Sequence, residues 1–135
     1  MSMLQEIQTY LAAQSGLGLT VQTNFFASYF PDSPDQCVTI YEYAGPAPQD
    51  TMGVQTGRAA WWKPRLQVVC RDVNYIPARN LAGSISVALH QIANQTIGGT
   101  LYYRIAAQQD PFLRARDQKQ RSEIACNYQV EKVFS

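Results

Sequence analysis

Residues 65–94 read RLQVVCRDVNYIPARNLAGSISVALHQIAN, and this stretch decides the fold. Apolar side chains at every second position from 66 to 70 predict a half-buried strand. Asn74 then stands where a side chain can cap a helix, and Pro77 falls in the first turn, where its missing N–H costs nothing. The order of strand, cap and helix predicts a crossover that carries the chain back along a sheet.

The helix of this crossover is predicted by the spacing of its apolar residues. They are Ala78, Leu81, Ala82, Ile85, Leu89, Ile92 and Ala93. Their period is that of an amphipathic helix, here of about 18 residues. Gly98 and Gly99 then predict a turn into a strand over 101–107. We expect this strand to run parallel to the one before the helix, through a right-handed crossover.

The remaining elements follow from shorter patterns. Alternation predicts strands over 37–43 and 121–133. Ser2 and Gln5 predict a capping box ahead of a short N-terminal helix that ends near Gly16. We therefore expect an α+β fold: a four-stranded mixed sheet with the long helix packed on one face, together with the short N-terminal helix.

Two long loops, 44–64 and 109–120, separate the predicted strands. Because the first and last strands are expected to run antiparallel to their neighbours, the two loops are predicted to lie at opposite ends of the sheet. The first loop closes on Trp61 and Trp62. Adjacent side chains of a strand point to opposite sides, so one of the two tryptophans is expected to meet solvent, a partner or the loop itself.

Composition limits the classes to which the protein can belong. Hydrophobic residues make up 46% and charged residues 16%, which is typical of a folded chain, and we expect a single domain over 1–135. The net charge of +1 gives no global field to attract nucleic acid or a membrane surface. No apolar run approaches the roughly 20 residues that span a bilayer, and Gln5 and Glu6 do not fit a signal peptide. We therefore expect a protein made and kept in a cytoplasm.

Candidate catalytic residues are few. The cysteines, Cys37, Cys70 and Cys126, are widely spaced in strand-like runs and are interpreted as small buried side chains. His90 is the only histidine and has no partner at metal-binding spacing, and the sequence has no phosphate loop or nucleophile elbow. We expect no catalysis, no cofactor and no metal. A Cys70–His90 nucleophile pair stays open as an enzyme hypothesis, and it requires a thiolate.

A double-proline segment, 31–35, contains Asp32 and Asp35. The prolines block a helix and set the direction of the chain. A calcium loop would need a run of oxygen ligands and a closing glutamate, which this segment lacks. The interpretation is a capped turn.

Basic side chains gather in two places. The first cluster, beside the tryptophans, consists of Arg58, Lys63 and Arg65, and the second consists of Arg114, Arg116, Lys119 and Arg121. Stacking aromatics with nearby arginines occur in nucleic-acid sites, but the near-neutral charge and the lack of a binding motif weigh against that function. Tryptophan and arginine are also enriched where proteins bind one another, so the clusters favour protein partners.

A further set of segments is distinctive as a combination. They are residues 19–24, 26–35, 37–43 and 66–72, Tyr75, Ala78 with Arg79, residues 111–113, Arg116 with Asp117, and residues 127–130. Together they resemble the small minor capsid proteins of bacteriophages, which are similar to tail terminators of long-tailed phages. The resemblance covers most of the chain, and 31–35 and 116–117 are its most specific parts. It departs at 44–50, where AGPAPQD stands in place of a short glycine-rich turn.

The resemblance implies a structural virion protein of the neck and tail, assembled in the host cytoplasm. Such proteins form rings, typically hexamers, that cap the tail tube and join it to the head connector. The implied partners are other copies of the chain, the tail tube protein and a head-completion or connector protein, with DNA passing through the lumen without specific binding.

The contact residues that we expect, chosen by their loop positions, are Arg58, Trp61, Trp62, Arg114, Arg116 and Lys119. The alternatives to a tail terminator are a head-completion or other neck protein, a small nucleic-acid-binding module and the Cys70–His90 enzyme.

Overall fold

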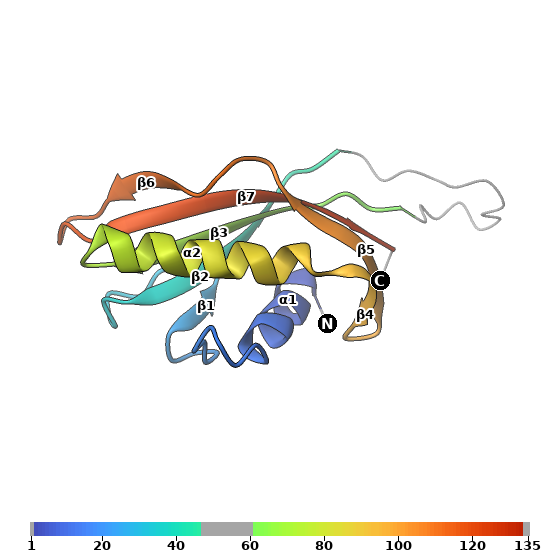
Figure 1. Cartoon of the computed structure of the whole chain (residues 1–135), viewed down its shortest axis with the longest axis horizontal. Coiled ribbons are helices and arrows are strands. Elements are labelled where there is room, and N and C mark those ends of the chain that lie inside the picture. The colour runs from blue at the N-terminus through green and yellow to red at the C-terminus, as the bar shows by residue number, and fades with distance from the viewer. Residues whose placement is uncertain (1, 47–60, 134–135) are drawn as a thin grey trace, which may run out of the picture.

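The computed structural model describes residues 2–46 and 61–133. The helices are α1 (Met3–Ala12) and α2 (Tyr75–His90). The strands are β1 (Phe25–Ala27), β2 (Cys37–Tyr43), β3 (Arg65–Asp72), β4 (Ala93–Ile97), β5 (Thr100–Ala107), β6 (Phe112–Arg116) and β7 (Ser122–Lys132). Both helices lie on the same side of a curled sheet (Figure 1).

The sheet has more strands than the sequence predicted. Within the described residues, seven strands form one sheet in the order β1-β2-β3-β7-β5-β4, with β6 paired to β7. The predicted four-stranded sheet under one long helix is therefore wrong. The four predicted strands are present as β2, β3, β5 and β7, but β1, β4 and β6 extend the edges, and the sheet curls into half of a barrel around the two helices (Figure 1).

Strand β7 connects the two halves of the sheet. It pairs antiparallel with β3 along one side, and with β5 and then β6, in line, along the other. The pairing shifts register between Tyr102 and Arg104 in β5 and between Leu113 and Ala115 in β6, and such irregularities increase the local twist. Because β3 and β5 are both antiparallel to β7, they run parallel to each other, as predicted, with β7 between them.

The two ends of the molecule carry different connections, as predicted. Trp62 pairs with Lys132 at one end of β7, and the turn between β6 and β7 precedes Ser122 at the other (Figure 1). Residues 47–60 of the first loop lie outside the described residues, and β6 occupies part of the second.

Helix α2 is shorter than predicted and ends at His90. The chain leaves the helix because the residues assigned to its end enter β4, where Asn94 has a left-handed φ of 48° that an α-helix does not hold. Gly98 and Gly99, with φ values of 60° and 87°, form the turn between β4 and β5. The predicted glycine turn is present, and the strand before it was missed.

The helix starts differ in how well the sequence predicted them. The capping box of α1 is confirmed: the Gln5 N–H donates to Ser2 Oγ at 3.3 Å, and the Ser2 N–H donates to Gln5 Oε1 at 2.9 Å. Asn74 occupies the N-cap position of α2 as expected, but the predicted capping bond is wrong, because its side chain makes no such bond and its N–H donates to Asp72 Oδ1 at 3.3 Å. Helix α1 also ends before Gly16.

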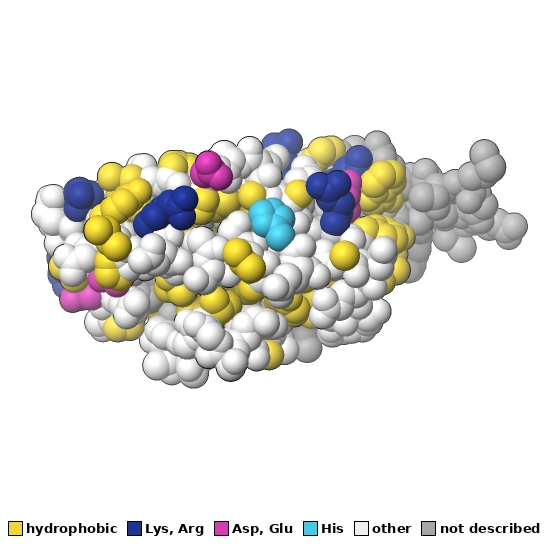
Figure 2. Space-filling model, viewed as in Figure 1, with side chains coloured by type: hydrophobic (Ala, Val, Ile, Leu, Met, Phe, Trp, Pro, Cys, Tyr) yellow, Lys and Arg dark blue, Asp and Glu magenta, His cyan; other side chains and the backbone are white. Residues whose placement is uncertain are grey.

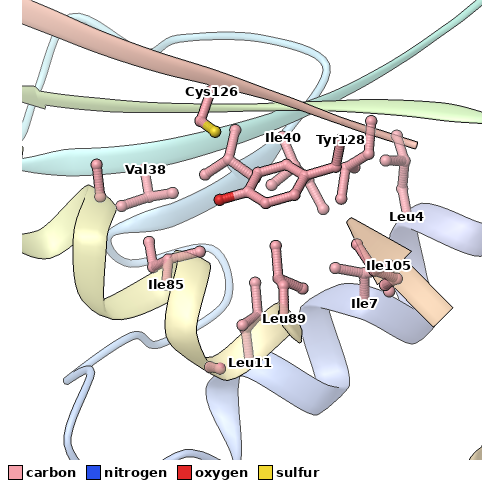
Figure 3. Close-up of a cluster of buried hydrophobic side chains, with 14 of the residues drawn as sticks. Leu4, Ile7, Leu11, Val38, Ile40, Ile85, Leu89, Ile105, Cys126 and Tyr128 are labelled. Carbon is pink, nitrogen blue, oxygen red and sulfur yellow. The ribbon is translucent and has the colours of Figure 1, made fainter. Parts of the chain in front are cut away.

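The core lies between the sheet and the helices. Tyr128 of β7 is fully buried, and its ring points toward Ile85 and Leu89 of α2 (Figure 3). Helix α1 closes the other side of this cluster with Ile7 and Leu11. Every second residue from 124 to 130 belongs to this core, which confirms the alternation predicted for the last strand.

Candidate assembly surfaces

A buried arginine joins two loops at the β6–β7 end of the molecule. Arg121 directly precedes β7, and only 6% of its side chain is exposed. Its Nε donates to Asp117 Oδ2 at 2.6 Å, and its Nη1 donates to the Asp32 carbonyl oxygen at 2.6 Å and to Asp35 Oδ1 at 3.1 Å. The guanidinium therefore ties the β6–β7 turn to segment 31–35.

A second buried arginine holds the same segment to the sheet. Arg71 of β3 donates from Nη2 to the Pro34 carbonyl oxygen at 2.7 Å and from Nε to that of Asp35 at 3.2 Å. Its guanidinium carbon lies 4.9 Å from the centre of the Phe30 ring. The double-proline segment is thus a loop fixed by arginines, and the aspartates weighed above as calcium ligands face cationic side chains.

Charge pairing favours the ionised forms in this cluster. The hydrogen bond and charge of Lys119 lower the pKa of Asp32. Burial opposes ionisation of Asp117, but hydrogen bonds from the backbone and side chain of Arg121 outweigh it and lower the pKa of this carboxyl. Burial also opposes the charge of Arg121, yet its bond to Asp117 raises the pKa of the guanidinium. Both carboxyls and the guanidinium are therefore charged at neutral pH.

Three of the predicted contact residues lie beside this cluster. Lys119 Nζ is 2.7 Å from Asp32 Oδ2, and Arg114 Nη2 is 2.9 Å from Glu123 Oε1. Arg116 donates to the hydroxyl of the first residue of β7 at 3.1 Å. The side chains of Lys119 and Arg114 remain 58% and 36% exposed, so both can still reach a partner although their charges are matched within the subunit.

The predicted tryptophans lie at the other end of the sheet. The Trp62 N–H donates to the Lys132 carbonyl oxygen at 2.8 Å, and the Lys132 N–H donates back at 2.9 Å, so Trp62 continues the sheet. Lys63 Nζ lies 4.3 Å from the centre of the Trp61 ring. Both tryptophans are half-buried, and Trp62 lines a pocket of about 540 Å³ between the ends of β2 and β3. Arg58 lies outside the described residues.

The predicted contact residues therefore form two groups and not one site. The tryptophans lie beside the last residue of β7, and the basic group lies beside its first. Strand β7 has 11 residues, and at a rise of about 3.3 Å per residue it separates the groups by roughly 33 Å.

The two faces of the sheet differ in chemistry. On the face away from the helices, Gln67 donates to Asn127 Oδ1 at 2.9 Å, and Arg114 Nη1 donates to Gln67 Oε1 at 3.2 Å. These bonds continue the network of the basic group across β3, β7 and β6. On the opposite side, over α2, the described Lys and Arg side chains lie apart, with hydrophobic side chains between them (Figure 2). This dispersed charge does not form the basic stripe typical of a nucleic-acid interface.

A buried acidic residue was missed entirely. Glu6 of α1 is 1% exposed, and its carboxylate accepts hydrogen bonds from Thr100 Oγ1 at 2.8 Å and from the Tyr102 hydroxyl at 2.7 Å. These bonds attach α1 to the β4–β5 hairpin. The available signal was its position one helical turn after the buried Met3, but an isolated glutamate at that spacing is usually solvent-exposed.

The structure does not assemble the Cys70–His90 pair. The ring of His90 contacts Ser86 at 3.4 Å, accepts at Nε2 from the backbone N–H of Ala107 at 2.9 Å, and packs edge-on against the Tyr128 ring. Cys70 is fully buried, and burial raises the pKa of its thiol far above the ordinary value, which opposes a thiolate. The three cysteines are free and buried, which confirms their interpretation as core side chains.

The described parts of the chain hold neither a helix that could span a membrane nor a cluster of metal-ligating side chains. Neither helix is long and apolar enough to cross a membrane. Histidine, cysteine, aspartate and glutamate side chains do not gather there in groups of three or more that could hold a metal ion.

Comparisons with known proteins bear on the family and the fold. A family model described as "Bacteriophage tail terminator protein" matches residues 8–134. A solved structure entitled "Virion of native gene transfer agent (GTA) particle" contains a chain with a similar fold, with a TM-score of 0.68 and 13% sequence identity. The match covers 98% of this chain and 96% of that chain. No curated protein matches the sequence.

Proposed function

Because the chain belongs to the bacteriophage tail terminator family, and is therefore a structural protein of the phage tail, we propose that it forms a ring that caps the tail tube and joins it to the head connector. The ring is a hexamer in the neck of the virion, and it assembles in the host cytoplasm. Its partners are other copies of the chain, the tail tube protein and a head-completion or connector protein. DNA passes through the lumen without specific binding.

The observation that carries this proposal is the chemical difference between the two ends of the subunit. One end has half-buried tryptophans beside Lys63, and the other has a basic turn tied to carboxylates by Arg121. A terminator contacts the tail tube on one side and a head-side protein on the other, so it needs two unlike surfaces. Strand β7 links the two surfaces within one sheet.

The contact residues of these surfaces are Trp61 and Trp62 at one end, and Arg114, Arg116 and Lys119 at the other. Arg58, which shortly precedes the tryptophans in the sequence, is proposed as a further contact residue. Half-buried tryptophans are typical anchors of protein interfaces. At the basic end, Asp32 and Glu123 already hold the cationic side chains in place, so little side-chain entropy is lost when a partner binds.

Two measurements test the proposal. The mass of the purified protein, measured by light scattering with and without tail tubes, is expected to reach six subunits of 15.1 kDa. In a phage that lacks the gene, tails of abnormal length are expected, and the chain supplied in trans should restore normal tails. A protein that stays monomeric under both conditions, together with normal tails in its absence, would contradict the proposal.

A further inference from the structure

An apolar row crosses the sheet and ends at an uncovered side chain. Phe25 of β1 pairs with Val38 of β2, which pairs with Cys70 of β3. Cys70 pairs with Ile124 of β7, and Ile124 pairs with Leu113 of β6. The first four side chains are completely buried, whereas Leu113 is 43% exposed. The row therefore stops at an apolar side chain on the β6 edge.

Strand β6 is also a free edge. In the described part of the chain it pairs only with β7, and all five of its residues are exposed. Phe112, next to Leu113, is exposed as well. An unpaired edge with exposed apolar side chains is a place where another chain can add. Arg116 adds a cationic side chain to this edge, whereas the charge of Arg114 is matched by Glu123 within the subunit.

A pocket of about 250 Å³ lies at the opposite edge of the sheet. Its lining includes Leu17, Leu19, Val38, Leu81, Asn24 and Gln36. Because Val38 belongs to the apolar row, the pocket and Leu113 lie at the same height along the strands and on the same face. A cavity of about 150 Å³ is large enough to bind benzene, so this pocket has room for a leucine side chain.

Charged residues are unevenly divided along the chain. Residues 2–46, which form α1, β1 and β2, contain four carboxylates and no lysine or arginine, whereas residues 61–133 contain ten lysines and arginines against five carboxylates. Three of these four carboxylates have partners within the subunit: Glu6 is buried against Thr100 and Tyr102, Asp32 pairs with Lys119, and Asp35 pairs with Arg121. Asp35, next to the pocket residue Gln36, keeps a side chain that is 61% exposed, and Arg116 of β6 is bound to an uncharged hydroxyl. Asp35 therefore offers a carboxylate next to the pocket, and Arg116 offers a cation on the β6 edge.

We propose that adjacent copies of the chain meet through these two edges, with Leu113 of one copy inserted into the pocket of the next. This inference rests on the proposed ring and names its subunit contact. A contact between two different surfaces is head-to-tail, which is the class that closes into rings. Antiparallel pairing of two β6 edges, centred on Arg114, would instead place like charges opposite each other, which is destabilising.

Disulfide cross-linking tests this contact. Leu113→Cys and Gln36→Cys are combined in a Cys37→Ala background, because Cys37 also lines the pocket. Both new cysteines replace exposed side chains, so the fold should be kept. Under mild oxidation of assembled protein, we expect a ladder of covalent oligomers. The matched control combines Leu113→Cys with Thr96→Cys, an exposed position of β4 on the same side of the sheet as β6, and should give no ladder.

Mixing the single variants separates a head-to-tail contact from a symmetric one. Each single variant carries one half of the disulfide, so the mixture should stop at a covalent dimer, and neither variant should cross-link alone. Dimers of Leu113→Cys alone, or assembled rings without a disulfide between positions 36 and 113, would overturn the inference.

Tail length reports the proposed function independently. If tails have normal length but the disulfide does not form, the proposed contact is wrong and the terminator function stands. If the disulfide forms but the protein does not control tail length, the contact stands and the terminator function is wrong.

Discussion

The guanidinium of Arg121 is shared by acidic residues of two separate loops, so its removal would leave like charges facing one another. Breaking a buried ion pair typically costs about 3–5 kcal/mol. Asp32 and Asp35 are more than half exposed, however, and solvent screens their repulsion. We expect Arg121→Ala to lower the free energy of unfolding by about 2 kcal/mol, measured by urea denaturation at pH 7.

Arg104 supplies the matched control for this substitution. Its side chain is 64% exposed and lies 3.6 Å from Glu131. An exposed pair of this kind contributes little, so Arg104→Ala should change stability by less than about 1 kcal/mol. If both variants lost the same free energy of unfolding, the ion pairs of Arg121 would stabilise the two loops no more than an exposed ion pair does.

The acidic partners of this cluster predict a pH dependence. Asp32 and Asp117 have pKa values below the ordinary 3.8 in the folded protein, so the folded state binds their protons less tightly than the unfolded chain. Their stabilisation is therefore present above the unfolded pKa and is lost as the pH falls through the folded values. We expect the free energy of unfolding to decline below about pH 4. Asp117→Asn should flatten this decline in urea titrations, and an unchanged slope would contradict the assignment.

At the scale of single elements, the β4–β5 hairpin turns on two adjacent glycines with different surroundings. Both have positive φ, so alanine is strained at either position by roughly 1 kcal/mol. A Cβ on Gly98 would also lie 2.8 Å from Glu6 Oε2, whereas one on Gly99 meets nothing within 4 Å. Glu6 is held by Thr100 and Tyr102 and has little freedom to move.

We therefore expect Gly98→Ala to cost about 1 kcal/mol more than Gly99→Ala in chemical denaturation. Both variants place alanine at a positive φ, and Gly99, at 87°, lies farther from the left-handed helical value than Gly98, at 60°, so a larger loss at Gly98 points to the contact with Glu6. Equal losses would show that α1 adjusts to the added methyl group.

The strands that the sequence did not predict have a common property. Burial produces the alternation by which a strand is detected, and β4 and β6 consist almost entirely of exposed residues. Strand β1 has only three residues, too few for a period. The predicted strands β3 and β7 are largely buried, and their patterns were correct. An edge strand is held in its conformation by hydrogen bonds to the adjacent strand. The residue pattern of the edge segment alone does not show which strand that is.

The same reasoning explains what was missed in the candidate surfaces. The basic cluster around Arg114 and Lys119 was visible because its members are close in sequence. Two partners of Arg121, Asp32 and Asp35, were not, because they lie more than 80 positions away and reach it only through the folded loop. Glu6 was missed for an equivalent reason, since its hydrogen-bond donors lie in the β4–β5 hairpin.

At the scale of the whole molecule, the two ends should be separable by mutation. We expect the pairs Trp61→Ala/Trp62→Ala and Arg114→Ala/Arg116→Ala to impair different steps. One pair should leave tails of uncontrolled length, and the other should leave normal tails that fail to join heads, as seen by electron microscopy of particles. Ser84→Ala, an exposed change on α2, is the control. If both double variants gave complete particles, the assigned contact residues would be wrong.

The position of β7 in the chain also affects when a subunit can form. Arg65 of β3 pairs with Gln129, so a strand made midway through translation waits for one made near its end. Until the ribosome has added residues 122–132, β1-β2-β3 and β4-β5 remain two half-sheets with open edges. Because the paired strands are far apart in sequence, the sheet forms slowly, and it is complete only after β7 has been synthesised. Under the proposed terminator function, only subunits with a completed β7 are therefore competent to cap a tail.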